Sequence, residues 1–146
     1  MAETNTQIRL ASRPEGWVTT DNFQLTEEPV PEPADGQVLV RNVFLSVDPY
    51  MRGRMNDVKS YVPPFALGDV LKGGAVGKIV ASRNPGFAEG DWVNGILGWE
   101  NYSLASGQGL YKLPDIDVPK SWHLGILGSS GMTAYVGLFE IARTLP

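Results

Sequence analysis

One segment of the sequence combines several side chains that could do chemistry, and it directly follows the most strand-like run of the chain. It reads SVDPYMRGRM over residues 46–55. Asp48-Pro49 is expected to end the strand, because the residue before a proline is conformationally restricted, and to present Tyr50 at the rim. The phenol of Tyr50 could then donate a hydrogen bond to a carbonyl oxygen that gains negative charge during a reaction.

Two arginines follow this tyrosine and allow a second interpretation of the segment. Arg52 and Arg54 could form ion pairs with Asp48 or Asp57, or they could attract a phosphate. In the first case the segment would have only a structural role. The residue types alone leave the structural and the chemical interpretations open.

Residue types that bind metals or attack substrates are otherwise scarce. The sequence has no cysteine and one histidine, His123. These counts exclude a disulfide framework, a thiolate nucleophile and a site of several histidines in one chain, so no metal site is expected. His123 lies beside Trp122 in a short amphipathic segment and is interpreted as a structural or surface histidine.

Two glycine-rich stretches are candidates for a phosphate-binding loop. They are GGAVG at 73–77 and GILGSSG at 125–131, and neither has the G-x-G-x-x-G spacing of a dinucleotide-binding loop. The first stretch is predicted to be a strand with bulges or close backbone approaches. The second is predicted to open a helix, where free N–H groups could meet an anion, although helix capping is the simpler role.

Composition and charge exclude several classes of partner. The 146 residues include 12 basic and 16 acidic ones, a net charge of −4, which is not typical of a nucleic-acid-binding protein. The N-terminus has no cationic segment followed by an apolar one, and no run approaches the roughly 20 apolar residues of a membrane span. We therefore expect no nucleic-acid partner, no membrane partner and a cytoplasmic location.

The elements that must position these residues are mostly strands. The clearest is 37–47, where apolar residues occupy both faces, which predicts that both faces are covered. Weaker strands are predicted at 8–11, 23–26, 75–82, 92–97, 102–105 and 110–113. Short strands separated by regular turns predict a mainly β fold with short helices, arranged as a small barrel or sandwich.

The last quarter of the chain is helical in pattern. A short helix is predicted at 119–127 and a longer one at 129–143, with Ser129 or Ser130 as its N-cap. The longer helix is apolar on more of its surface than packing on one sheet requires, so it is expected to need cover on several sides. Together with the end of the chain at Pro146, this predicts a domain of a larger protein. A helix buried within one small domain stays open.

Four motifs occur in order along the chain. They are SVDPYMRGRM at 46–55, SYVPPF at 60–65, GDWVNGILGWENYS at 90–103 and LGILGSSGMTAYVGLFEIA at 124–142. In these motifs the sequence resembles the zinc-independent medium-chain dehydrogenases/reductases, in the branch of alkenal double-bond reductases, prostaglandin reductases and curcumin reductase. The resemblance implies that 1–146 is the GroES-like N-terminal catalytic domain, a partly open barrel ending in an apolar linker helix. It also implies a Rossmann NADP-binding domain that is absent from this chain.

The resemblance implies metal-free transfer of hydride from NADPH to the β-carbon of an α,β-unsaturated aldehyde or ketone. The enolate that forms needs hydrogen-bond donors at its oxygen, and Tyr50 matches the catalytic tyrosine that this domain supplies in the family. A second tyrosine of the family belongs to the absent domain, and which of the two donates the proton stays open. Tyr50, Pro49 and the Met132-Thr133 step match residues that contact the cofactor. Most of NADP(H) would be bound by the missing domain.

Tyr61 and Trp99 match loops that wall the substrate cleft of the family, and an ordinary core position for each stays open. The sequence departs from the family at Ser129-Ser130, where relatives often have Met-Pro, and this concerns the helix start. The domain alone is expected to be inactive. Its expected partners are a small enone, enal or quinone and its own Rossmann domain, through which full-length relatives commonly form homodimers.

Two other functions stay open at this point. A zinc-free quinone reductase would share nearly every motif and differ in substrate preference. A stand-alone barrel would instead act as a protein-binding module through its apolar helix.

Overall fold

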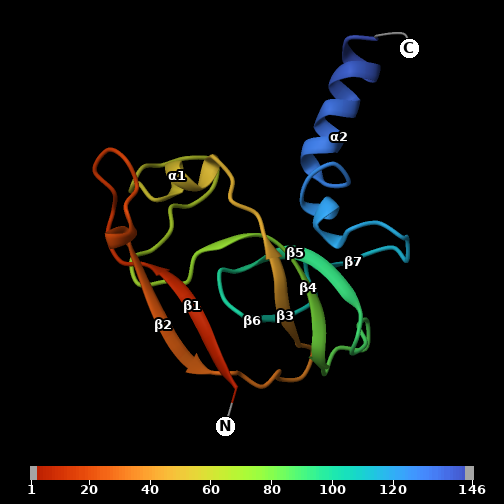
Figure 1. Ribbon diagram of the computed structural model, residues 1–146, viewed down its shortest axis with the longest axis horizontal. Helices are drawn as coiled ribbons and strands as arrows, with labels where there is room; N and C mark the ends of the chain where they lie inside the picture. Colours follow the sequence, from red (N-terminus) through yellow and green to blue (C-terminus); the bar gives the residue numbers. More distant parts are fainter. Residues whose placement is uncertain (1–2, 144–146) are drawn as a thin grey trace.

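The computed structural model of the protein describes residues 3–143, which form a mainly β structure with short helices (Figure 1). A two-stranded sheet pairs β1 (Thr4–Leu10) with β2 (Phe23–Pro29). A five-stranded sheet has the order β6-β3-β4-β5-β7, and each neighbouring pair in it is antiparallel. Its strands are β3 (Val38–Leu45), β4 (Lys72–Ser82), β5 (Trp92–Gly98), β6 (Tyr102–Ala105) and β7 (Tyr111–Lys112).

The helices are short. They are α1 (Tyr50–Arg54), the 3-10 segments η1 (Thr20–Asn22) and η2 (Lys120–Leu124), α2 (Ser129–Tyr135) and its π-helical continuation η3 (Val136–Ile141). Within the described residues, no helix has both the length and the apolar character that crossing a membrane requires.

The predicted mainly β fold with short helices is confirmed, with differences at the ends of elements. β3 ends at Leu45, before the predicted end at 47, and β7 is shorter than the predicted strand at 110–113. β1 begins at Thr4, before the predicted start at 8, because it pairs with β2 along its whole length, from Thr4 opposite Pro29 onward. Cross-strand pairing, which local composition does not reveal, therefore extends this strand.

The prediction that both faces of β3 are covered is correct only for its first half. Val38 and Val40 on one face and Leu39 on the other are buried, whereas Phe44 and Leu45 are 39% and 38% exposed. The pairing of β3 with β4 shifts register between Asn42 and Phe44. Such an irregularity ends the regular alternation of the strand, so its second half turns apolar side chains toward the surface.

Two hydrophobic clusters form the core. The first lies within the five-stranded sheet and consists of Val38, Val40, Ala75, Ile79, Val93, Leu97 and Leu110. The second consists of Leu10, Met51, Met55, Phe65 and Leu71 and therefore joins β1 to α1. A Cβ on Gly73 would clash with the terminal methyl of Met51, so the glycine lets α1 pack closely against β4. This packing fixes the position of Tyr50, the first residue of α1.

The sequence analysis did not predict α1. Pro49 is its N-cap and has a φ of −56°, a helical value that proline favours. The helix has five residues and forms no hydrophobic repeat in the sequence. The two methionines that it places in the second cluster are the physical reason that it forms here.

The helix formed by α2 and η3 projects from the barrel (Figure 1) and has no buried residue. The predicted cap at Ser129 or Ser130 is wrong: the N-cap is Gly128, and no side chain caps this end. A Cβ on Gly128 would lie 2.5 Å from the carbonyl oxygen of His123, so only glycine fits this close turn. The helix ends at Ile141, before the predicted end at 143.

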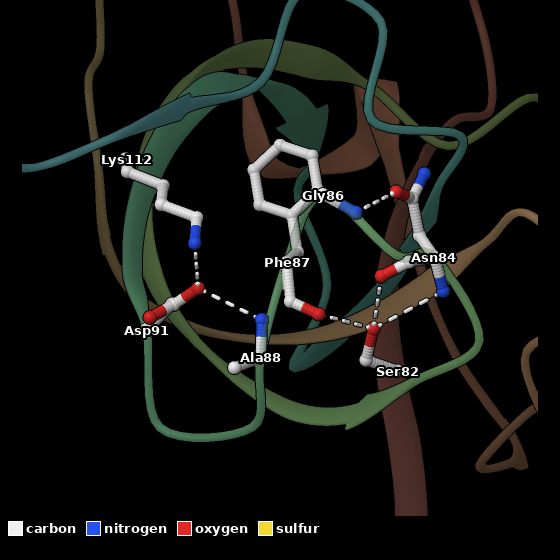
Figure 2. Close-up of polar contacts among 7 residues, drawn as sticks. All are labelled: Ser82, Asn84, Gly86, Phe87, Ala88, Asp91 and Lys112. Atoms are coloured by element: carbon white, nitrogen blue, oxygen red, sulfur yellow. Dashed lines mark hydrogen bonds and ion pairs between the residues drawn. The ribbon is translucent and has the colours of Figure 1, made fainter.

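A network of polar contacts fixes the turn that follows β4 (Figure 2). The hydroxyl of Ser82 donates a hydrogen bond of 2.8 Å to the carbonyl oxygen of Phe87. The carboxylate of Asp91 accepts a hydrogen bond of 2.8 Å from the backbone N–H of Ala88 and lies 2.7 Å from the Nζ atom of Lys112. Asp91 directly precedes β5, and its contact with Lys112 links this turn to β7.

Candidate active site

A pocket of about 370 Å³ lies where β3 ends and α1 begins. Separate parts of the chain supply its walls: mainly the connection from β3 into α1, the strand β5, and the segment from η2 into α2, with smaller contributions from β4 and the region of β7. Their polar side chains in the pocket wall are Ser46, Asp48, Tyr50, Asn94, His123, Ser129 and Ser130. Segments far apart in the sequence therefore converge at the end of the strand that the sequence analysis singled out.

Tyr50 is half-buried in this pocket. Burial raises the pKa of its phenol, the negative charge of Asp48 raises this pKa further, and the positive charge of Arg54 opposes the change in part. A phenol is protonated at neutral pH even at its ordinary pKa, and the raised pKa favours the same form. Tyr50 is therefore a hydrogen-bond donor that could meet an oxygen gaining negative charge.

The pocket is lined mainly by neutral residues. Among the described residues that line it, Asp48 carries the one formal charge, and no lysine or arginine is present. Phosphates in proteins are usually met by cations or by backbone N–H groups at a glycine-rich loop. A neutral ring and a carbonyl group fit the donors and small residues of this wall, such as Gly74 and Gly95.

A second pocket of about 320 Å³ also contains Tyr50 and brings it together with Tyr61. Tyr61 is 85% exposed, so its ring lies at the surface of this pocket and not in the hydrophobic core. Arg54 and Lys59 line the same pocket. Tyr50 consequently stands between a pocket with a carboxylate and a pocket with two cations.

The other residues that matched the cofactor site lie close by in the chain but not in the first pocket. Pro49 is exposed and stands between two residues of the pocket wall, Asp48 and Tyr50. Met132 is 64% exposed and lines an apolar hollow of about 640 Å³ beside α2, while the next residue, Thr133, is also exposed. The hollow and the first pocket share Gly128.

Trp99 lies elsewhere. It is partly buried, packs against the second hydrophobic cluster, and lines neither pocket beside Tyr50. Its indole Nε1 is buried without a hydrogen-bond partner among the described residues. A contact between Trp99 and a substrate stays a prediction.

Of the alternatives open for Arg52 and Arg54, ion pairs with Asp48 or Asp57 do not form among the described residues. Arg52 donates hydrogen bonds to the side chain of Asn56 at 2.8 Å and to the carbonyl oxygen of Gly16 at 2.7 Å. Arg54 donates from Nε to the carbonyl oxygen of Pro63 at 3.0 Å and stacks over a phenylalanine ring at 4.0 Å. Backbone carbonyl groups of neighbouring loops, which are invisible to residue types, are the partners that hold both arginines.

The interpretation of the first glycine-rich stretch is confirmed. Residues 73–77 lie within β4, opposite the register shift of β3, and a Cβ on Gly77 would lie 2.5 Å from the carbonyl oxygen of Arg41. The backbones of the two strands approach too closely there for a side chain. The stretch therefore serves strand pairing.

The sequence analysis did not place His123 in a functional site. The structure buries it in the wall of the first pocket, where it is 7% exposed and Nε2 has no partner among the described residues. The short amphipathic segment around His123 indicated a structural or surface histidine. That pattern predicts burial but gives no information about hydrogen-bond partners.

Comparisons with known proteins fit this geometry. A family model described as the N-terminal domain of oxidoreductase matches residues 6–113. The NADPH-dependent curcumin reductase of Escherichia coli (strain K12) is 51% identical over 134 residues, which are 92% of this chain and 39% of that protein. The NADP(+)-dependent 2-alkenal reductase of Nicotiana tabacum is 48% identical over 114 residues, which are 77% of this chain and 33% of that protein.

A solved structure is similar over nearly the whole chain. It is the crystal structure of CurA in complex with NADPH from Vibrio vulnificus, with a TM-score of 0.86 and 44% sequence identity, covering 95% of this chain and 41% of that one. The chain thus spans less than half the length of the relatives that it matches.

Proposed function

This chain belongs to the medium-chain dehydrogenase/reductase oxidoreductases, as the N-terminal domain of the curcumin, alkenal and prostaglandin reductase branch, and we propose its function from that membership. Together with a nucleotide-binding domain, it reduces the C=C bond of α,β-unsaturated aldehydes and ketones. The relatives that carry this inference are named as NADPH-dependent curcumin reductase and NADP(+)-dependent 2-alkenal reductase.

The observation that carries the proposal is the position and protonation of Tyr50. Its phenol lines a pocket and, like any tyrosine at neutral pH, it is protonated and can donate a hydrogen bond; burial and Asp48 raise its pKa and so favour the same protonated form. Reduction of an enone at its β-carbon leaves negative charge on the carbonyl oxygen. A fixed donor at that oxygen stabilises the charge more in the transition state than in the ground state, which accelerates the reaction.

NADPH, when bound, would supply the hydride. Tyr50, Pro49, Met132 and Thr133 are the residues of this chain that we propose to hold its nicotinamide end. The lack of a lysine or arginine among the described residues of the first pocket supports this division, because the phosphates then need partners on the other domain. Tyr61, beside Tyr50 in the second pocket, would contact the substrate, and Trp99 would support the same cleft.

The apolar surface of α2 and η3 supports a second domain at this place. Phe139 and Ile141 are 47% and 77% exposed, and the apolar hollow of about 640 Å³ lies along the same helix. Contiguous apolar surface of this kind marks an interaction site in soluble proteins. A nucleotide-binding domain packed here would cover the helix and bring its cofactor next to Tyr50.

The test uses the full-length protein, purified and supplied with NADPH and benzylideneacetone, an enone with an aromatic tail. We expect NADPH oxidation coupled to formation of benzylacetone, the saturated ketone, identified by mass spectrometry. Formation of the unsaturated alcohol would contradict reduction of the C=C bond, as would a complete lack of turnover.

A quinone as substrate gives the second arm of the same test. We expect a lower kcat/KM with a simple benzoquinone than with the enone. The reverse order would show that the protein is a quinone reductase of the same family and would overturn the proposed substrate class.

A further inference from the structure

His123 lies in the wall of the pocket that contains Tyr50 and is the single histidine of the chain. It is 7% exposed, and its Nε2 atom is sealed from solvent without a hydrogen-bond partner among residues 3–143. Buried polar atoms are almost always hydrogen-bonded in folded proteins, so one that is not needs an explanation. Nε2 is sealed, so a ligand in the pocket cannot be its partner, and the atom instead limits which ring nitrogen can carry the proton.

The two ring nitrogens of His123 are in different environments. Nε2 is fully buried, whereas Nδ1 is not, and Nδ1 forms no hydrogen bond with any described residue. A neutral imidazole has one N–H donor and one acceptor nitrogen. A sealed acceptor is tolerated better than a sealed N–H donor, so the ring is expected to carry its proton on Nδ1. This N–H is then available to a group in the pocket.

Two elements fix the two donors of this pocket independently. Tyr50 opens α1, which the second hydrophobic cluster anchors, and His123 lies on η2. Leu124, the next residue, approaches β4 so closely that its Cδ2 atom would lie 3.6 Å from a Cβ on Gly74. The pocket wall therefore contains two side chains that can donate a hydrogen bond, and they stand on separately anchored elements.

We propose that the Nδ1–H group of His123 is a second hydrogen-bond donor to the carbonyl oxygen of the substrate, beside the phenol of Tyr50. The inference rests on the proposed function and adds to it a residue that selects carbonyl substrates. A carbonyl oxygen has two lone pairs and accepts both hydrogen bonds. Both bonds strengthen as the oxygen gains negative charge.

Kinetics of the full-length protein with benzylideneacetone test the role of the N–H. His123→Phe keeps a ring of similar shape and removes both nitrogens, and we expect kcat/KM to fall about 10²-fold, the usual effect of losing one such donor. His123→Asn keeps an N–H donor and should recover part of the loss. Trp122→Phe changes the neighbouring residue, which is 47% exposed and outside the pocket wall, and should leave kcat/KM unchanged.

Nitrogen NMR gives a readout that a merely structural histidine would not move. The ring signals of His123 in the full-length protein are identified as the pair that is missing from His123→Phe, and we expect the tautomer protonated at Nδ1. Adding NADP+ and benzylacetone, whose carbonyl group mimics that of the substrate, should shift the Nδ1 signal. The Tm values of the variants show whether each one is folded before its kinetics are compared.

Two results separate the failure of this inference from the failure of the proposed function. If the wild-type protein reduces the enone, and His123→Phe is folded and equally active, His123 is not a donor and the proposed function stands. An unchanged ring signal on addition of NADP+ and benzylacetone would overturn the inference in the same way. If the wild-type protein does not reduce the enone at all, the proposed function fails, and the role of His123 fails with it.

Discussion

Tyr50 owes its proposed role to its surroundings more than to its residue type. Burial and the carboxylate of Asp48 both disfavour the phenolate, so the pKa of Tyr50 is above its ordinary value of 10.0. A phenol with a raised pKa stays protonated at neutral pH, so it can donate a hydrogen bond but does not accept a proton as a general base. The chemistry expected from it is therefore stabilisation of a developing oxyanion and not proton abstraction.

The substitution Tyr50→Phe in the full-length protein tests this role. It removes one hydroxyl and keeps the ring that packs in the pocket. Loss of one oxyanion donor typically lowers kcat by 10²–10³, or about 2.7–4 kcal/mol, and a remaining donor would reduce the effect. We expect a moderate loss of kcat/KM for benzylideneacetone, measured under saturating NADPH.

Tyr61→Phe is the matched control, because Tyr61 shares the second pocket with Tyr50 and is 85% exposed. We expect it to change KM more than kcat. If Tyr50→Phe kept full activity while Tyr61→Phe abolished it, the roles of the two tyrosines would be reversed.

A second prediction at the residue scale concerns metals. The chain has no cysteine and one histidine, and no group of three or more metal-ligating side chains occurs among residues 3–143. We expect that a strong chelator leaves the rate of the full-length protein unchanged. Elemental analysis of the purified protein that found one bound zinc per chain would refute this prediction.

Residue types could predict part of the candidate site. Tyr50 was identified because proline ends a strand directly before it, which is a local effect. The burial of His123 and the partners of Arg52 and Arg54 depend on loops distant in the sequence, such as the carbonyl groups of Gly16 and Pro63. No pattern of residue types specifies such contacts, and these were the points that the sequence analysis missed or predicted wrongly.

At the scale of elements, the start of α2 depends on a close backbone approach. A Cβ on Gly131 would overlap the carbonyl oxygen of Ile126, whereas a Cβ on Gly137 would meet no atom within 4 Å. Gly131→Ala should therefore destabilise this chain by about 1–3 kcal/mol, as overpacking does. Gly137→Ala should stabilise it by up to about 1 kcal/mol, because alanine favours helix. Denaturant unfolding of the two variants should give opposite signs, and a loss of stability in Gly137→Ala would contradict the open surroundings of that residue.

The turn after β4 makes a prediction about pH. The hydrogen bond from Ala88 and the contact with Lys112 lower the pKa of Asp91 below its ordinary value of 3.8. The unfolded chain then binds more protons than the folded one in acid, so the carboxylate stabilises the fold above pH 3.8. This stabilisation is lost as the pH falls through the lowered pKa.

Asp91→Asn isolates that effect, with Asp117→Asn as an exposed control outside the network of Figure 2. At neutral pH we expect a lower Tm for Asp91→Asn than for the wild-type chain. The difference should shrink in acid, as the wild-type carboxylate becomes protonated. A difference in Tm that did not depend on pH would mean that the shape of the side chain matters and its charge does not.

Some elements of the fold could be predicted from local sequence, and others depend on contacts with distant residues. Strands with dense β-branched residues, such as β3, were predicted near their true positions. The five-residue helix α1 was missed, since it forms because Met51 and Met55 reach the second cluster and not because of a local repeat. The cap of α2 was predicted wrongly, because a good capping residue was available, but Gly128 alone fits the turn beside His123.

At the scale of the whole molecule, two surfaces point in the same direction. One is the first pocket, which has donors for a carbonyl or a neutral ring and no cation among its described lining residues. The other is the exposed apolar face of α2 and η3, whose apolar hollow shares Gly128 with that pocket. Figure 1 shows this helix projecting from the strands. The described lining of the pocket has no cation that would bind phosphates, and the apolar face of the helix is not packed against another described element. A single nucleotide-binding domain packed on the helix would supply both the phosphate contacts and the cover for the helix.

This arrangement predicts that the 146-residue chain by itself binds NADPH weakly. Most of the affinity for a dinucleotide comes from contacts with its pyrophosphate and adenosine, which a G-x-G-x-x-G loop helps to hold. This sequence has no such loop. Calorimetric titration of the chain with NADPH should show no binding at low micromolar concentrations, whereas the full-length protein should bind under the same conditions. A low micromolar Kd for the chain alone would mean that its own residues hold the phosphates, and the division of the cofactor between two domains would then be wrong.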